Sequence, residues 1–339
     1  MTVEDQAAVE EPLERESRWW ERLLAGSSTW IGLILIGLIV VFTLLKPDEF
    51  SSASNARNIA TDAAVLLVLA SGMTFVIITA GIDLSVGGVL VFSGVVAAKL
   101  MNEVGGDNWG VILVGLATAL VAGGAWGTLN GLLVTKAKIP PFIVTLGTLG
   151  MSLGSALLIT GGVDEREVPF KLISTIGTGR LADQVPWLVI IALAVAIVFG
   201  VILAATRFGR YTYAVGSNIE GTRRAGVAVD RHLTAVYAIA GTLAGLAGFL
   251  SLARFGTTTI GGHSTDNLNA IAGVVIGGTS LFGGVGTMLG TFFGVLIPAV
   301  LQNGFIIVGV QPFWQQVAVG AVLIIAVYLD QLRRSRYRQ

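Results

Sequence analysis

The chain has 339 residues, of which 54% are hydrophobic and only 12% are charged, and its formal net charge is zero. Soluble domains carry about 25% charged residues, so this composition excludes an ordinary soluble protein, and the zero net charge gives no sign of nucleic-acid binding. The absence of cysteine excludes disulfides, thiolate metal sites and cysteine nucleophiles. The 45 glycines are typical of membrane helices that approach one another closely. The composition therefore predicts an all-α integral membrane protein.

Residues 1–27 form a polar head that carries seven acids and three arginines. A secretory signal peptide begins with a basic segment and ends at a cleavage site, so this acidic segment without such a site is not expected to be one. Trp19 and Trp20 suit a membrane interface. A partly disordered tail is the alternative interpretation of the same segment.

Membrane-crossing helices need about 20 mostly apolar residues. Ten runs come near this length: 28–45, 60–80, 84–101, 109–135, 141–160, 185–205, 233–252, 266–281, 288–306 and 314–330. The third and eighth runs are rich in glycine and can be broken or re-entrant, which is tolerated where the backbone is buried in protein or faces water. The sequence thus predicts a transmembrane region over 28–330 and a basic cytoplasmic tail over 331–339.

The basic residues predict the orientation. With ten spans both termini share one side, and that side holds 14 of the 21 lysines and arginines, against seven on the other. The positive-inside rule then places both termini in the cytoplasm. The loop 206–232 falls on the same side.

Loop 206–232 is the longest polar interruption between hydrophobic runs and carries five arginines against two acids. Asn218 is a favourable N-cap, Glu220 falls in the first turn, and Gly226 fits just past a helix end. These residues predict a helix of about seven residues, which is only marginally stable alone in water. Two interpretations stand: an ordinary basic loop, or a lever that fits a groove on a partner protein.

The predicted spans carry few ionisable groups, and Asp83 is the only acid in 63–102. Ion-coupled carriers generally place acids or histidines inside the membrane. The sequence also has no G-x-x-x-x-G-K-[ST] phosphate loop and no cluster of histidine and acidic residues. We expect no catalytic residue, no metal and no cofactor. If the protein pumps a solute, the energy must come from another subunit.

Four segments carry a resemblance to a known family: GMTFVIITAGIDLSVGG at 72–88, LNGLLVTKAKIPPFIVTLGT at 129–148, GRYTYAVGSNIEGTRRAGV at 209–227 and GGTSLFGGVGT at 277–287. In this order they resemble the permease subunits of ATP-binding-cassette importers for monosaccharides, the ribose-type branch. The resemblance covers residues 55–330. It implies the type II importer permease fold, a multi-pass protein of the plasma or inner membrane, and no catalytic activity of its own.

The resemblance also implies partners: a second permease chain, either identical or closely related, a separate ATPase subunit and an extracytoplasmic sugar-binding protein. Membrane lipid surrounds the complex. The coupling loop of the family reads similarly to GGN-E-AAR-x-GI, whereas Gly221, Thr222 and Arg224 depart from that pattern. The residues expected to couple to the ATPase are Arg210, Gly216, Asn218, Glu220, Arg223, Arg224 and Gly226.

Five polar residues are candidates for the translocation path: Asp83, Ser85, Asn130, Thr145 and Thr148. Each also has a structural interpretation. Asp83 and Ser85 can cap a helix that starts near Leu84, and the threonines can bond the carbonyls four residues earlier. Asn130 needs a hydrogen-bond partner, because an unpaired amide is costly in an apolar environment.

Three further glycines, Gly147, Gly150 and Gly154, follow these candidates in the predicted fifth span. They indicate close helix packing.

Three other functions are alternatives to the sugar importer: a permease for another substrate, a secondary carrier and a membrane enzyme. The related permeases for branched-chain amino acids or nucleosides share the architecture, although they usually match GIDLSVGG and PPFIVTLGT less closely. A secondary carrier is disfavoured by the missing intramembrane acids, and a membrane enzyme by the missing cluster of reactive residues. Which sugar or polyol is carried does not follow from the sequence.

Overall fold

The computed structural model describes residues 27–311 except residue 264, and seven further residues between 314 and 328. The predicted polar head before residue 27 and the tail 331–339 lie outside these residues, as does most of the predicted span 314–330.

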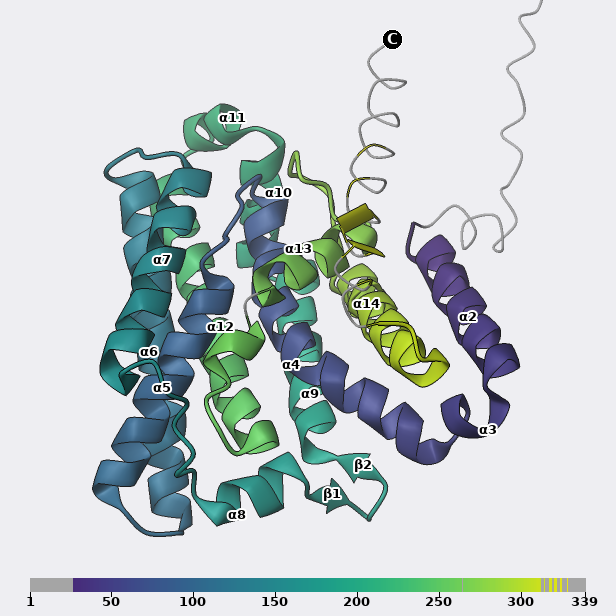
Figure 1. Cartoon of the computed structure of the whole chain (residues 1–339). Helices are drawn as coiled ribbons and strands as arrows, with labels where there is room; N and C mark the ends of the chain where they lie inside the picture. The colour runs from purple at the N-terminus through teal and green to yellow at the C-terminus, as the bar shows by residue number, and fades with distance from the viewer. Residues whose placement is uncertain are drawn as a thin grey trace, which may run out of the picture.

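The described chain is built of helices and one short two-stranded hairpin (Figure 1). The α-helices are α2 (Ser27–Leu45), α3 (Pro47–Phe50), α4 (Ala53–Ile78), α5 (Val86–Val104), α6 (Trp109–Thr135), α7 (Pro141–Thr160), α8 (Phe170–Leu172), α9 (Trp187–Ala205), α10 (Arg207–Ser217), α11 (Ile219–Arg224), α12 (Val229–Phe255), α13 (Asp266–Ile276) and α14 (Met288–Val308). The other elements are a π-helix (Ile173–Gly177), a 3-10 helix (Ile260–His263) and the antiparallel strands β1 (Arg180–Leu181) and β2 (Val185–Pro186).

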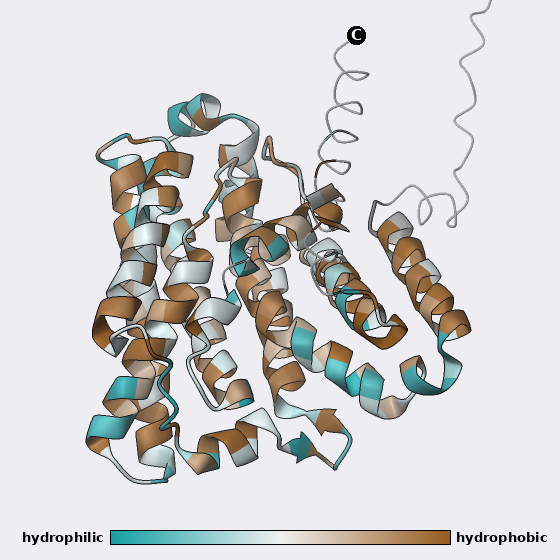
Figure 2. Ribbon diagram, in the orientation of Figure 1, coloured by the Kyte–Doolittle hydropathy of each residue, from teal (hydrophilic) through white to brown (hydrophobic). Residues whose placement is uncertain are grey.

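Seven helices of the described part are long and apolar enough to cross a membrane: α4, α5, α6, α7, α9, α12 and α14. The hydrophilic residues gather at the two ends of the molecule, with apolar helices between them (Figure 2). Helix α11 lies at one end, whereas α3, α8 and the hairpin lie at the opposite end (Figure 1). Large apolar side chains on α2, α7 and α9 are exposed between these ends, as a lipid-facing surface requires.

Glycines bring α6 and α12 into backbone contact. Gly123 and Gly127 of α6 face Gly241 and Gly245 of α12. A Cβ at any of the four would overlap backbone atoms of the opposite helix. Because lipid supplies no hydrophobic driving force between helices, close van der Waals packing of this kind holds membrane helices together. The α6–α12 pair is therefore packed backbone against backbone.

The structure resolves the status of the two glycine-rich spans. The predicted third span is an unbroken helix, α5, but it starts only at Val86, after the non-helical segment 79–85. The predicted eighth span, 266–281, is wrong in length, because α13 ends at Ile276. Gly278, Gly283 and Gly284 adopt positive φ angles of +86°, +83° and +76° in the loop that follows, a conformation incompatible with a right-handed helix. An eleven-residue helix is about 16 Å long, roughly half the thickness of a bilayer core.

The starting ends of α5 and α13 meet inside the molecule. The side-chain amide of Asn267 in α13 donates to the carbonyl oxygen of Leu84 at 3.1 Å. A Cβ on Gly87 of α5 would lie 3.4 Å from both the Asn267 nitrogen and the His263 carbonyl oxygen. Two helices that begin within the protein therefore abut each other, an arrangement that transporters use to build sites at the ends of discontinuous helices.

Candidate functional site

Helix α11 is the short helix that the sequence predicts. The Asn218 side chain accepts a hydrogen bond from the Gly221 N–H at 2.8 Å, which caps its start. At its end Gly226 has φ +85° and donates to the Arg223 carbonyl, and Val227 donates to the Thr222 carbonyl. This closing pattern needs a residue that tolerates the left-handed conformation. The cap and the stop assigned from the sequence are both confirmed, in a helix of six residues.

A second polar helix, α10, precedes α11 and was not predicted. Thr206 caps it by accepting from the Gly209 N–H at 3.3 Å. The buried Thr212 hydroxyl lies 3.0 Å from Nε2 of His232 at the start of α12, which fixes α10 against that span. Helix α12 starts at Val229, four residues before the predicted span. The missed signal is a threonine N-cap directly after the apolar run of α9.

Gly216 at the end of α10 marks the junction between the coupling loop and the membrane helices. A Cβ at Gly216 would overlap the Ile78 carbonyl oxygen at the end of α4. The same carbonyl accepts from the Gly284 N–H at 2.8 Å, and the Tyr213 hydroxyl donates to the Gly286 carbonyl at 2.7 Å. Burial raises the pKa of the Tyr213 phenol, so the hydroxyl stays protonated and remains a donor. The arm formed by α10 and α11 is therefore fixed to α4 and to the loop 277–287 at once.

The charges of α11 lie on its exposed surface. Glu220 is 3.6 Å from Arg223 and 3.5 Å from Arg224, and Arg223 is 3.3 Å from Asp230 of α12. Exposed pairs of this kind contribute little to stability. Arg210 is likewise exposed on α10. The seven residues assigned to ATPase coupling thus lie in one arm at one end of the molecule, with the charged ones facing outward.

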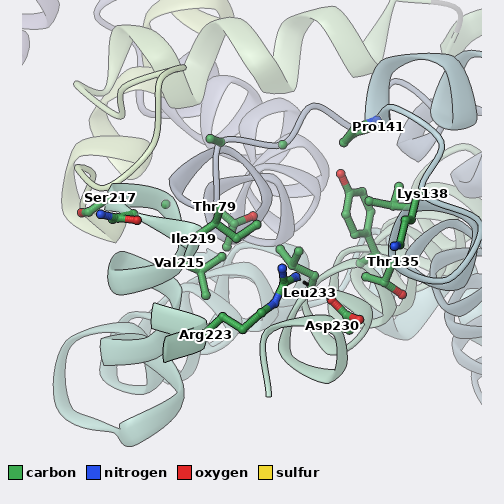
Figure 3. A pocket seen from close by; sticks show the side chains of 16 residues that line it. Thr79, Thr135, Lys138, Pro141, Val215, Ser217, Ile219, Arg223, Asp230 and Leu233 are labelled. Atoms are coloured by element: carbon green, nitrogen blue, oxygen red, sulfur yellow. Dashed lines mark hydrogen bonds and ion pairs between the residues drawn. The ribbon is translucent and has the colours of Figure 1, made fainter. Parts of the chain in front are cut away.

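A cavity of about 840 Å³ lies between this arm and the spans (Figure 3). Arg223 reaches toward Asp230, and Thr135 and Lys138 lie on the other side of Asp230 in the figure. Gly81 and Tyr237 also line the cavity, and a Cβ on Gly81 would lie 2.7 Å from the Tyr237 hydroxyl oxygen. That hydroxyl is buried and has no hydrogen-bond partner among the described residues. The cavity therefore joins a charged rim to a buried polar group.

Three of the predicted path residues form one buried chain of hydrogen bonds next to Gly81. The Ser85 hydroxyl donates to the Asp83 carboxylate at 2.6 Å, and the Ser85 N–H donates to the same oxygen at 2.9 Å. The Asn130 amide of α6 donates to the Ser85 hydroxyl at 2.8 Å. Asp83 is 1% exposed and Asn130 is fully buried. Asp83 and Ser85 form the turn before α5, although the Ser85 side chain makes no capping bond to that helix. The side-chain N–H of Asn130 has a partner in Ser85, whereas its side-chain oxygen is buried without a partner among the described residues.

Thr145 and Thr148 bond carbonyl groups instead of facing an open space. Thr145 donates to the Pro141 carbonyl at 2.9 Å and lies 3.2 Å from the Ile82 carbonyl, and Thr148 donates to Val144 at 3.1 Å. The structure thus brings Thr145 to the segment that holds Asp83.

The predicted glycines of α7 do not pack as expected. A Cβ on Gly147, Gly150 or Gly154 would meet no atom within 4 Å. The expectation of close packing at these glycines is therefore wrong within the described chain, because their face of α7 points outward.

Sequence reasoning missed the participation of Tyr237 and Lys138 in the cavity. Tyr237 is the only tyrosine in the predicted span 233–252, and this isolated hydroxyl in an apolar run was the available signal. Sequence reasoning also left out a polar cluster at the end opposite α11. That cluster depends on residues far apart in the chain, such as Asp62 and Arg254, which form an ion pair.

Seven spanning helices, an apolar surface between two polar ends and a polar helical arm define an integral, multi-pass membrane protein. Residues 55–327 match the family described as "Branched-chain amino acid transport system / permease component", and the chain belongs to this family.

The chain is similar to several curated transport proteins. It is 36% identical to a D-allose transport system permease protein of Escherichia coli, over 88% of this chain and 90% of the relative. It is 38% identical to a ribose import permease protein of Bacillus subtilis, over 90% of this chain and 92% of the relative. A fructose import permease protein of Rhizobium meliloti is 33% identical over 89% of this chain and 85% of the relative. No solved structure gave a significant match.

Proposed function

We propose that this chain is the membrane permease subunit of an importer driven by a separate ATPase, and that it carries a monosaccharide or related polyol across the plasma or inner membrane. The observation that carries the proposal is the similarity over nearly the full chain to permeases named for D-allose, ribose and fructose. These three names share the chemistry of a neutral, polyhydroxylated ring. The permease itself catalyses no reaction, and ATP hydrolysis belongs to the partner.

A permease for a branched-chain amino acid is the second candidate, since the family description names that substrate. The two classes of substrate differ in their ionised groups. A branched-chain amino acid carries an ammonium and a carboxylate at neutral pH, whereas a monosaccharide carries neither. The full-length similarity to sugar permeases favours the sugar.

We place ten helices in the membrane, with the head 1–27 and the tail 331–339 in the cytoplasm. The count adds three segments to the seven long helices: α2, the half-length α13 and the segment 314–330. The orientation rests on the 14 basic residues assigned to the side of α11, against seven opposite. Loop 206–232 is then the cytoplasmic coupling loop of the transmembrane domain 28–330.

Helix α11 inserts into a groove on the ATPase in this proposal. It is capped at both ends, it is exposed, and the α10–α11 arm is fixed to α4 and to the loop 277–287. A displacement of α11 is therefore transmitted to two membrane elements. Arg210, Glu220, Arg223 and Arg224 are available for the partner surface, as the exposed donors and acceptors of the arm.

The cavity beside α11 and the chain Asp83–Ser85–Asn130 are the candidate inner part of the translocation path. The cavity is open to the coupling loop, and its wall reaches Gly81, two residues before Asp83. Thr145 contacts the same segment from α7 through the Ile82 carbonyl, whereas Thr148, one turn further along α7, bonds its own helix. The outward glycine face of α7 supports contact with a second permease chain, since it has no neighbour within the described chain.

Uptake by reconstituted vesicles tests the proposed function. Vesicles that contain the permease, its ATPase and its binding protein are supplied with radiolabelled D-ribose, D-allose, D-fructose and L-leucine. We expect ATP-dependent accumulation of at least one sugar and none of leucine. Accumulation of leucine alone would establish the second candidate, and accumulation driven by an ion gradient without the ATPase would refute both.

A further inference from the structure

A second cavity, of about 280 Å³, lies at the end of the molecule opposite α11, between α4, α12, α13 and α14. Its polar lining comes from Asp62, Arg254, His263, Asp266, Asn269 and Gln302, four of which carry ionisable side chains. Ionisable residues within membrane helices are costly unless they face a cavity or one another, and they commonly mark a substrate pathway. This cavity is distinct from the one beside the coupling loop and belongs to the outer side under the proposed topology.

The start of α13 fixes two of the polar groups in place. His263 Nδ1 lies 2.7 Å from the Asp266 carboxylate, and His263 Nε2 lies 2.7 Å from the Ser251 hydroxyl and 3.0 Å from the Thr259 hydroxyl. His263 is 8% exposed, so its ring is held in one orientation. One wall of the cavity is therefore preorganised, which lowers the entropic cost of binding a ligand.

The lining of the cavity also contains an ion pair that leaves a donor unused. Arg254 of α12 pairs with Asp62 of α4 through Nη2. The other terminal nitrogen, Nη1, is buried and has no hydrogen-bond partner among the described residues. A buried donor without a partner destabilises the folded state. Because Nη1 is buried, a ligand oxygen in the cavity can accept from it only after a small movement of the Arg254 side chain.

The size and composition of the cavity define the ligand. Small-molecule pockets have volumes of about 300–1,000 Å³, so a cavity of 280 Å³ is at the small end of this range and suits a single small ring. Carboxylates accept hydrogen bonds, the Arg254 guanidinium donates them, and the amides of Asn269 and Gln302 do both. Phe255 and Pro298 supply apolar surface beside these groups. Alternating hydroxyl and C–H surfaces of a sugar ring match this mixture.

We propose that this cavity is an outer subsite that receives a single neutral monosaccharide before it passes toward the chain Asp83–Ser85–Asn130. The inference rests on the proposed function and deepens it. Asn267, next to Asp266, donates to the Leu84 carbonyl, so the start of α13 directly connects the subsite with the segment that leads to Asp83. We expect the affinity of this subsite for sugar to be low, because the bound sugar must leave it toward the inner side.

Thermal unfolding of the purified full-length chain tests the subsite without its partners. The unfolding midpoint is measured against increasing concentrations of D-ribose, D-allose, D-fructose, D-xylose, D-glucose and L-leucine, with L-ribose as the control for the general stabilisation that sugars give as osmolytes. A ligand that binds only the folded state raises the midpoint as its concentration exceeds its Kd. We expect a saturable rise for at least one D-sugar that exceeds the rise in L-ribose. No such rise, or a saturable rise in leucine alone, would overturn the subsite.

Two variants assign the binding to this cavity. Gln302→Ala and Asn269→Ala each remove one amide, and Gln184→Ala is the matched control, because it removes an exposed amide outside the cavity. We expect the first two to raise the half-saturating sugar concentration about 2- to 10-fold, the effect of one lost hydrogen bond, and the control to leave it unchanged. Unchanged values in both variants would refute the assignment. If vesicles containing the full importer still accumulate sugar in that case, the subsite fails while the proposed function stands.

Discussion

Gly216 of α10 and Ile78 of α4 are in direct backbone contact, although 138 positions separate them in the sequence. The Ile78 carbonyl belongs to the last turn of α4, where no intrahelical donor remains, and the Gly284 N–H satisfies it at 2.8 Å. Three segments thus meet at one carbonyl group: the end of the coupling arm, the end of a central span and the loop before α14. A side chain at position 216 would separate all three.

Substitution of Gly216 by alanine should weaken this junction. The added Cβ overlaps backbone atoms, which cannot rotate away as a side chain can, and overpacking of this kind costs about 1–3 kcal/mol. We expect a lower unfolding midpoint and reduced ATP-driven uptake. Gly37→Ala is the control, because no atom lies within 4 Å of a Cβ at that helical position and alanine favours a helix by about 1 kcal/mol. Equal midpoints for the two variants would contradict the role of the junction.

Helix α11 should be required for ATPase association. Proline at Thr222 removes the bond from the Thr222 N–H to the Asn218 carbonyl and costs a helix about 3 kcal/mol. We expect Thr222→Pro to reach the membrane but to lose co-purification with the ATPase. Asn218→Ala should have a smaller effect, about 1 kcal/mol, and Asn218→Asp almost none, since aspartate also caps. Normal co-purification of the proline variant would show that α11 is only a loop.

The coupling arm can also be tested for lipid binding as an alternative role. Glu220→Lys adds positive charge to the exposed surface of α11, next to Arg223 and Arg224. Each basic residue near anionic lipid gains about 1 kcal/mol. Docking on the ATPase predicts weaker ATPase association for this variant, whereas lipid binding predicts unchanged transport and stronger binding of anionic lipid.

Backbone contact between α6 and α12 should make Gly127 intolerant of substitution. A Cβ at Gly127 overlaps the Tyr237 carbonyl oxygen, whereas one at Gly124 meets only the Thr242 hydroxyl at 2.9 Å, which can rotate. We expect Gly127→Ala to reduce the yield of folded protein in detergent, measured by size-exclusion chromatography, and Gly124→Ala to change it little. A monodisperse Gly127→Ala protein of wild-type stability would argue against close packing of the two helices.

A second copy of the chain should cover the glycine face of α7. In a two-fold symmetric dimer the same surface meets itself, and this cysteine-free chain allows a single-cysteine test. We expect Gly154→Cys to form an oxidative dimer in membranes and Gly37→Cys on α2 to remain monomeric. The reverse pattern would move the dimer contact to α2, and a monomeric mass for the assembled transporter would exclude the dimer.

The proposed topology places position 218 in the cytoplasm and position 171 outside. Single cysteines at these two positions can be treated in intact cells with a thiol reagent that does not cross the membrane. We expect labelling at 171 and none at 218 until the cells are opened. Labelling of 218 in intact cells would invert the orientation and would place the 280 Å³ cavity on the cytoplasmic side.

The sequence alone determined the central part of each long helix and the caps of α11, although α4 starts at Ala53, seven residues before the predicted span 60–80. Run length and hydropathy are local properties, so helices such as α6 and α7 have the predicted bounds, 109–135 and 141–160. The Asn218 cap and the Gly226 stop also depend only on neighbours within a few residues. The glycine content indicated that the third and eighth predicted spans could be broken, but it did not predict that α13 ends at Ile276.

Only the tertiary structure decided which distant groups meet. The pairing of Asp62 with Arg254 joins residues 192 positions apart, and the contact of Gly216 with Ile78 depends on how three segments pack. The direction of each polar side chain was also undetermined: Thr148 bonds its own helix, whereas Asn130 reaches Ser85 in the turn before α5. Local sequence patterns do not determine which distant residues meet. Helix packing depends on how closely the helix backbones approach one another at glycines throughout the bundle. That packing then brings distant polar groups together in an interior of low dielectric constant.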